Sequence, residues 1–270
     1  MKLEIIGIIT YLVPLTVSLL GAVSIFGNKH KGVARNLLSL TLVILTYKFA
    51  YDILGVLDLD LLQLIAFNAG NLLWFVAPPM LYYFYISLQT HNYELDKPAF
   101  RKHLITGGVI FTFSMLILGL LPIEQYMEVL NFRFQDSPTF EHNFYRFALF
   151  SLGTPLLFLQ WFFYYFLLDR LIKEQQTYYG KFYGSYEKRN EQLMRRTFHF
   201  LIAIFAMSFG VQFMQITNPI YIILINLIQG TLLYFVISAG REQIDIKSYR
   251  MYKLSSHEEE IKNNKVVNEL

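Results

Sequence analysis

Apolar residues in this chain form seven long runs that are separated by shorter polar or charged segments. Each run is close to the ~20 residues that an α-helix needs to cross the hydrocarbon core of a bilayer. Inside lipid, a helix satisfies its own backbone hydrogen bonds, which makes it the expected structure of each run. The pattern therefore predicts an all-α polytopic membrane protein, a bundle of seven transmembrane helices. The predicted spans are residues 5–26, 37–57, 61–88, 103–121, 144–168, 197–216 and 219–239.

Lysine and arginine are distributed unevenly over the segments between these runs. Of the 23 basic residues, 19 fall in segments that lie on one side of a seven-span bundle. Because positively charged loops stay in the cytoplasm, we expect the N-terminus outside and the C-terminus in the cytoplasm of a bacterial inner membrane. The chain then divides into a transmembrane domain, residues 1–239, and a basic cytoplasmic tail, residues 240–270.

Composition excludes several classes of site. The chain is 54% apolar and 16% charged, its mean hydropathy is +0.38, and it contains no cysteine. A disulfide framework, a cysteine metal site and a thiol nucleophile are thereby excluded. The six histidines lack metal-site spacing, and no nucleophile motif or glycine-rich phosphate loop occurs. We expect a protein that is not an enzyme and that has no cofactor and no metal.

Two charged residues fall inside the second predicted span. Lys48 and Asp52 are four residues apart, so they share one helical face and can form an ion pair. An unpaired charge near the bilayer centre costs about 2.5–3.5 kcal/mol on insertion scales. Two interpretations are open: a permanent structural ion pair, or a ligand anchor or switch that breaks on activation.

Amide side chains recur in pairs three residues apart inside other spans, each pair on one helical face. With the predicted orientation, these amides lie in the middle or outer half of the membrane, whereas aromatic residues dominate the inner half. One interpretation is a ligand pocket that opens outward; the other is hydrogen bonding between helices, which is common in any bundle. The amides are Asn68 and Asn71, Gln212 and Gln215, and Asn226 and Gln229.

The longest basic connection, residues 169–196, mixes basic residues with tyrosines, as membrane-surface segments do. We expect either a helix lying on the membrane or a docking site for a cytoplasmic partner. In the tail, Ser255 and Glu258 have the spacing of a capping box and predict the start of a separate helix there. The expected signalling interface comprises Tyr183, Tyr186, Glu187, Lys188, Arg189, Arg195 and Arg196.

Four segments resemble, in order, the multi-span sensor region of AraC-type one-component transcriptional regulators of Bacteroidota. They are Ala77–Tyr85, His103–Ile105, Tyr183–Asn190 and Tyr252–Glu260, similar to the family's G-P-L-L-Y-L-Y, H-F-x-P, Y-S-x-x-E-K-x-N and Y-K-x-S-x-L-S-E-E elements. The glycine of the first element and the proline of the second are replaced. The resemblance implies seven spans followed by a helix-turn-helix domain, but these 270 residues contain no such motif. We therefore expect no direct nucleic-acid contact from this chain.

Taken together, the sequence predicts a sensor that binds a small molecule from the outer side, or responds to the state of the bilayer, and signals to the cytoplasm. The resemblance implies output to transcription through a missing or separate helix-turn-helix module. Expected partners are the lipid bilayer and either a second copy of the chain or a cytoplasmic signalling protein. The alternative is a small transporter or permease that uses Lys48 and Asp52.

Overall fold

The computed structural model of the chain is helical throughout the part that it describes. Described are residues 2–27, 32–57, 59–89, 97–120, 153–179, 185–213 and 218–268, and within these ranges no strand occurs. The helices are α1 (Lys2–Thr10), α2 (Leu12–Phe26), α3 (Val33–Val56), α4 (Asp60–Gln89), α5 (Lys97–Leu120), α8 (Gly153–Tyr179), α9 (Ser185–Phe213) and α10 (Pro219–Asn268).

The all-α prediction is confirmed, and a helix occupies each of the seven predicted spans, with α1 and α2 sharing the first. Among the described residues, three helical segments are long and apolar enough to cross a membrane: Ile5–Phe26, Val33–Leu54 and Pro219–Asp245. A shorter apolar helical segment covers Leu73–Leu88. The first part of the fifth predicted span, residues 144–152, lies outside the described residues.

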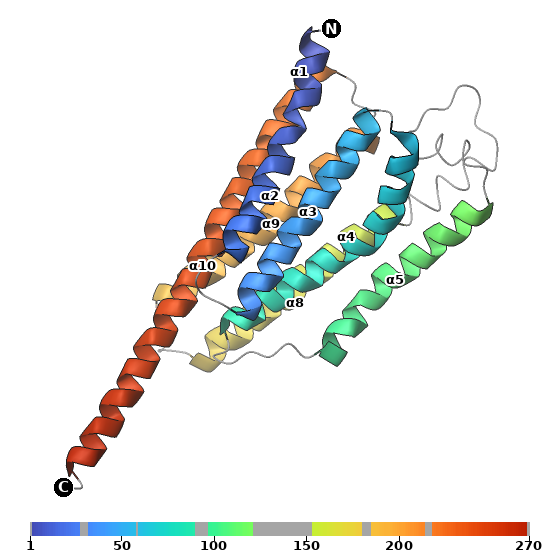
Figure 1. Cartoon of the computed structure of the whole chain (residues 1–270). Helices are drawn as coiled ribbons and strands as arrows, with labels where there is room; N and C mark the ends of the chain where they lie inside the picture. Colours follow the sequence, from blue (N-terminus) through green and yellow to red (C-terminus); the bar gives the residue numbers. More distant parts are fainter. Residues whose placement is uncertain are drawn as a thin grey trace.

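The helices form a ring. Going round it, α4 contacts α3, α3 contacts α2, α2 contacts α10, α10 contacts α9, α9 contacts α8, and α8 returns to α4. Helix α5 packs against the outside of α4 (Figure 1). The N-terminus lies at one end of this bundle, and α10 projects beyond the other helices at the opposite end, which we call the tail end (Figure 1).

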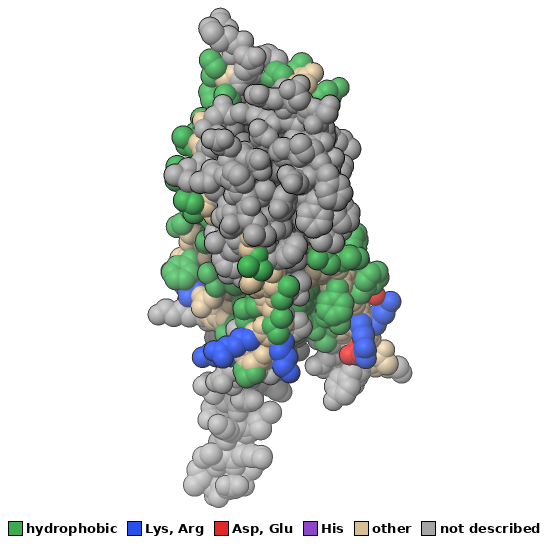
Figure 2. Space-filling view, turned by 90° about the vertical axis from the view of Figure 1, so that its right-hand side faces the viewer, with side chains coloured by type: hydrophobic (Ala, Val, Ile, Leu, Met, Phe, Trp, Pro, Cys, Tyr) green, Lys and Arg blue, Asp and Glu red, His purple; other side chains and the backbone are tan. Residues whose placement is uncertain are grey.

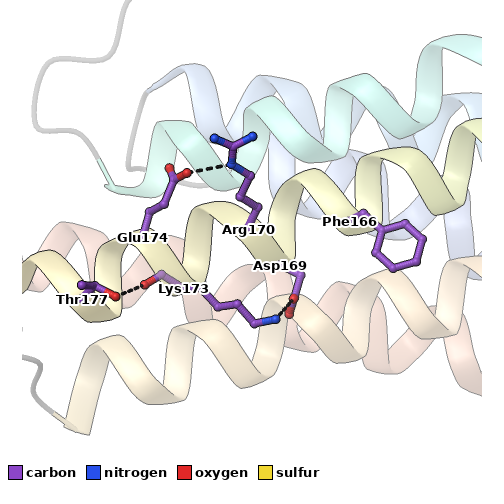
Figure 3. A pocket seen from close by; sticks show the side chains of 6 residues that line it. All are labelled: Phe166, Asp169, Arg170, Lys173, Glu174 and Thr177. Carbon is purple, nitrogen blue, oxygen red and sulfur yellow. Dashed lines mark hydrogen bonds and ion pairs between the residues drawn. The ribbon is translucent and has the colours of Figure 1, made fainter.

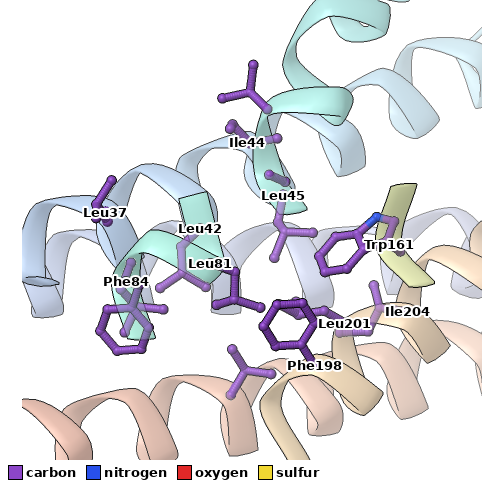
Figure 4. Packing of buried hydrophobic residues seen from close by; sticks show 14 of the residues in the cluster. Leu37, Leu42, Ile44, Leu45, Leu81, Phe84, Trp161, Phe198, Leu201 and Ile204 are labelled. Carbon is purple, nitrogen blue, oxygen red and sulfur yellow. The ribbon is translucent and has the colours of Figure 1, made fainter. Parts of the chain in front are cut away.

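Side chains from across the ring fill its centre. Trp161 of α8 is fully buried, and its ring lies 5.4 Å from that of Phe205 and 5.9 Å from that of Phe198, both on α9. Leu45 of α3 and Leu81 of α4 belong to the same buried cluster (Figure 4). Side chains from α3, α4, α8 and α9 therefore pack closely against one another inside the bundle.

The helices run on through two segments outside the predicted spans. Helix α8 continues to Tyr179 and α9 begins at Ser185, so most of residues 169–196 extends these two helices. Their position at a membrane surface, or their binding to a cytoplasmic partner, stays a prediction. Helix α10 is continuous past Ser255, so the predicted helix start there is wrong. A capping box starts a helix only where the preceding residues are not already helical, and here they are.

On the face drawn in Figure 2, the lysine and arginine side chains that are described lie toward the tail end, and the described side chains above them are mostly hydrophobic. This distribution agrees with the sequence, in which α5, α8, α9 and α10 all carry their basic residues at the end nearer the tail.

Candidate functional site

The first apolar helix is irregular at Tyr11, between α1 and α2: the Tyr11 backbone keeps helical angles (φ −62°, ψ −25°), but its N–H donates to Ile8 O, three residues earlier, at 3.2 Å. We call this tightened turn the helix break. Pro14 explains the break, because it has no N–H to donate to the carbonyl oxygen of Thr10 and its ring disfavours a regular helix there. The Thr10 hydroxyl donates to Gly7 O at 2.6 Å. A polar irregularity therefore interrupts the first span.

The predicted pairing of Lys48 with Asp52 is present, and both residues are well buried. Their side chains are 3% and 12% exposed, and Lys48 Nζ pairs with Asp52 Oδ2. The ammonium group also lies 5.4 Å from the centre of the Phe49 ring. Tyr11, at the helix break, is within electrostatic range of Asp52. The ion pair on α3 and the irregular turn thus lie on neighbouring helices, because α2 packs directly against α3.

Hydroxyl groups join this site to its neighbours. Thr46 of α3 donates to Ser18 Oγ of α2 at 3.0 Å. Tyr47 of α3 donates to Ala66 O of α4 at 2.7 Å. Helix α3, which carries the ion pair, is therefore hydrogen-bonded to both of its neighbours, α2 and α4.

Asn226 and Gln229 of α10, predicted to share a face, bond to different helices. Asn226 Nδ2 donates to Thr10 Oγ1 at the helix break, at 3.2 Å. Gln229 Nε2 donates to Ser208 Oγ of α9 at 2.8 Å and to Ile204 O at 3.3 Å. Both amides therefore hydrogen-bond between helices, and their use in a ligand pocket stays a prediction.

Several predicted residues fall outside what the structure describes. Gln215 and Tyr183 lie outside the described residues. For five others the helix is described but the side chain is not: Asn68, Asn71, Gln212, Tyr186 and Glu187. Their predicted roles stay predictions.

Helix α4 is bent (Figure 1), and it contains Pro78 and Pro79. Sequence reasoning missed one contact that these prolines make possible. Pro79 has no N–H for the carbonyl oxygen of Phe75, four residues earlier. Gln160 of α8 donates its Nε2 to that same oxygen at 3.1 Å. A side chain of α8 therefore replaces the backbone donor that α4 lacks. The prolines give a sequence signal for the vacant acceptor, but no sequence signal identifies Gln160 as its partner.

At the tail end, a network of charged and amide side chains joins α8 to α9. Arg195 pairs with Asp169 of α8 and, at 3.1 Å, with Glu191. Gln176 of α8 donates to the other oxygen of Glu191 at 2.7 Å. Hydrogen bonds from Lys173 and then Arg195, opposed by partial burial, hold the pKa of the Asp169 carboxyl below its usual value. The (i, i+4) spacing of Glu191 and Arg195 could have predicted their pairing from the sequence. No sequence pattern indicates the contacts that these two residues make with α8.

The same network includes α10. Arg189 of α9 pairs with Glu242. Gln243, only 1% exposed, donates its Nε2 to Asn190 O at 3.2 Å. We call this set of contacts between α8, α9 and α10 the tail-end junction. Of the predicted interface residues, Arg189 and Arg195 take part in it, whereas Lys188 and Arg196 are exposed.

Within the described residues, no group of three or more His, Asp or Glu side chains is arranged to hold a metal ion. No family model matches the chain, and no curated protein or solved structure matches it. The functional argument therefore depends on the geometry of the ion pair, the helix break and the tail-end junction.

Proposed function

We propose that this chain is a multi-pass signalling protein of the bacterial inner membrane, with the tail end in the cytoplasm. The state of the buried ion pair would be transmitted to the tail through α10. One observation carries the proposal: α10 contacts the broken first helix near one end and the tail-end junction further along, and it then continues unbroken to Asn268.

A rigid helix suits this role because a shift at one of its ends must appear at the other. Asn226 attaches α10 to Thr10, one residue before the break, and Tyr11 at the break is within electrostatic range of Asp52. Glycines bring the helices close: a Cβ on Gly230 would lie 2.7 Å from Val13 Cγ1. A ligand, or a change in the bilayer, that favours one arrangement of the break would shift the population of α10 positions.

The proposed orientation is supported by the basic side chains at the tail end, because such residues are retained on the cytoplasmic side. Output to transcription, through a helix-turn-helix module separate from these residues, is part of the proposal and is supported by the sequence resemblance alone.

The absence of cysteine allows a direct test by spin labelling. Labels would be attached to exposed positions at the tail end, Gln192→Cys on α9 and Asp245→Cys on α10. The distance between them would then be measured by pulsed electron resonance in reconstituted protein. Breaking the ion pair with Asp52→Asn is expected to shift the distance distribution or to add a second population.

Thr112→Ala on α5 is the matched control, because its hydroxyl bonds to Gly108 O within the same helix and, among the described residues, to no other helix. Identical distributions in all three proteins would contradict coupling. Saturable solute uptake into vesicles, abolished by Asp52→Asn, would instead support a transporter.

A further inference from the structure

A hollow of about 610 Å³ lies on the surface of α8, where exposed apolar residues give way to charged ones (Figure 3). Phe166, at its apolar end, is 66% exposed, and Leu159, Phe162 and Phe163 are exposed one or two turns earlier. The hollow therefore lies at the level expected for lipid headgroups if α8 crosses the membrane. Its lining residues are Phe166, Asp169, Arg170, Lys173, Glu174 and Thr177.

Two ion pairs border the exposed face of α8 on opposite sides (Figure 3). Lys173 pairs with Asp169 at 2.7 Å, and Arg170 pairs with Glu174 at 2.8 Å. Two cations and two carboxylates leave the lining with no net charge, so the lining itself does not favour an anionic ligand over a zwitterionic one. Ion pairs this exposed are weak, and they can open to admit a ligand.

The Arg170–Glu174 pair uses only part of each side chain. Arg170 donates through Nε to Glu174 Oε1. Within the described residues, no other hydrogen bond is made by its two Nη atoms, which lie at the outer end of the side chain (Figure 3), or by Glu174 Oε2. A guanidinium edge with two parallel N–H donors matches a phosphate group. A carboxylate oxygen accepts from an ammonium group.

We infer that this hollow binds the headgroup of a phospholipid that carries both a phosphate and a primary ammonium group, as in phosphatidylethanolamine. The phosphate bonds to the Nη atoms of Arg170, the ammonium donates to Glu174, and an acyl chain lies along Phe166 and Phe163. Lys173 can turn from Asp169 to the phosphate as a second cation. The loss of this ion pair costs little free energy, because Asp169 keeps its pairing with Arg195. The inference depends on the proposed membrane insertion and not on signalling.

The test titrates the full chain, purified in a neutral detergent, with three short-chain lipids and follows binding by native mass spectrometry. Phosphatidylethanolamine supplies both groups, phosphatidylcholine has an ammonium without N–H donors, and phosphatidylglycerol has no ammonium. We expect phosphatidylethanolamine to bind about five-fold more tightly than the other two, the difference that one exposed charged contact provides.

Single substitutions test which side chain binds the phosphate and which binds the ammonium group. Glu174→Gln is expected to lower the affinity for phosphatidylethanolamine to that for phosphatidylcholine, and Arg170→Gln to weaken binding of all three lipids. Lys188→Gln, which removes an exposed cation on α9, is the matched control and should leave binding unchanged. Asp52→Asn should also bind the lipid normally, so that a failure of the signalling proposal is distinguishable. Equal affinity for the three lipids, or binding unaffected by both α8 variants, would show non-specific lipid contact and overturn the inference.

Discussion

Gln160 of α8 donates a hydrogen bond to the carbonyl oxygen of Phe75, the backbone acceptor for which Pro79 supplies no donor in α4. Phe75 is fully buried, so an unpaired carbonyl at this position would carry the full penalty of desolvation. The carbonyl oxygen left without a donor in α4 is therefore satisfied by a neighbouring helix. Helix α8, which supplies the donor, also carries Asp169 of the tail-end junction.

This relationship predicts a specific non-additivity between Gln160 and Pro79. Gln160→Met keeps the length of the side chain but removes the donor, and it should lower the free energy of unfolding by about 1 kcal/mol. In Pro79→Ala, the new N–H of residue 79 can bond to Phe75 O within the helix. The same Gln160→Met change should then lower the free energy of unfolding by only a few tenths of a kcal/mol. Denaturant titration of the four proteins in detergent measures the difference.

Gln229→Met serves as the control for this cycle, because Gln229 bonds to Ser208 and Ile204 on α9, away from the α4 prolines. Its effect should be the same in the wild-type protein and in the Pro79→Ala variant. If the effect of Gln160→Met is equally large in both backgrounds, Gln160 does not substitute for the missing donor.

The buried ion pair should behave differently from an exposed pair of the same spacing. Lys48→Met leaves the Asp52 carboxylate buried without its cation and should lower the free energy of unfolding by about 3–5 kcal/mol. Adding Asp52→Leu should restore much of this loss, because two apolar side chains require no ionic partner. The measurement is again unfolding in detergent, with all variants at the same pH.

The exposed Arg170–Glu174 pair supplies the comparison, because its residues are also four apart on one helix. Arg170→Gln should change the free energy of unfolding by less than about 1 kcal/mol. Should Lys48→Met be as mild as Arg170→Gln, the buried pair would have to be hydrated, and the buried geometry described above would be wrong.

Asp169 predicts an acid-dependent loss of stability at the tail-end junction. Hydrogen bonds from Lys173 and Arg195 hold its pKa below the ordinary value of 3.8. A carboxyl whose pKa is lower in the folded state contributes stability that is complete above its unfolded pKa. That contribution is lost as the pH falls below about 3.8 and through the lowered folded value.

The free energies of unfolding of the wild-type protein and of Asp169→Asn should therefore differ by a constant amount between pH 5 and 7 and converge as the pH falls toward 3. Taking the difference removes the contributions of the other carboxylates, which titrate in both proteins. A difference that stays constant down to the lowest accessible pH would mean that the Asp169 carboxylate contributes nothing through its charge.

Helix positions could be predicted from the sequence, but several helix ends could not. The apolar runs located helices at all seven spans, because the length and hydrophobicity of a run are local properties. The sequence missed the end of α8 at Tyr179 and the unbroken continuation of α10 from the seventh span into the tail helix. A helix can end at the polar residues that follow an apolar run, or it can continue through them. Here α10 continues, and its polar residues form contacts with a neighbouring helix, such as that of Gln243 with Asn190 of α9.

The sequence by itself determined the class of fold, the one-sided distribution of basic residues, and the pairing of Lys48 with Asp52, because each depends on residues close together in the chain. Only the tertiary structure decided that Asn226 bonds to the broken first helix while Gln229, one turn away, bonds to α9. It alone brought Gln160 to Phe75 O. Contacts between helices depend on the rotation and register of each helix, which the packing of the whole core decides, so no local pattern records them.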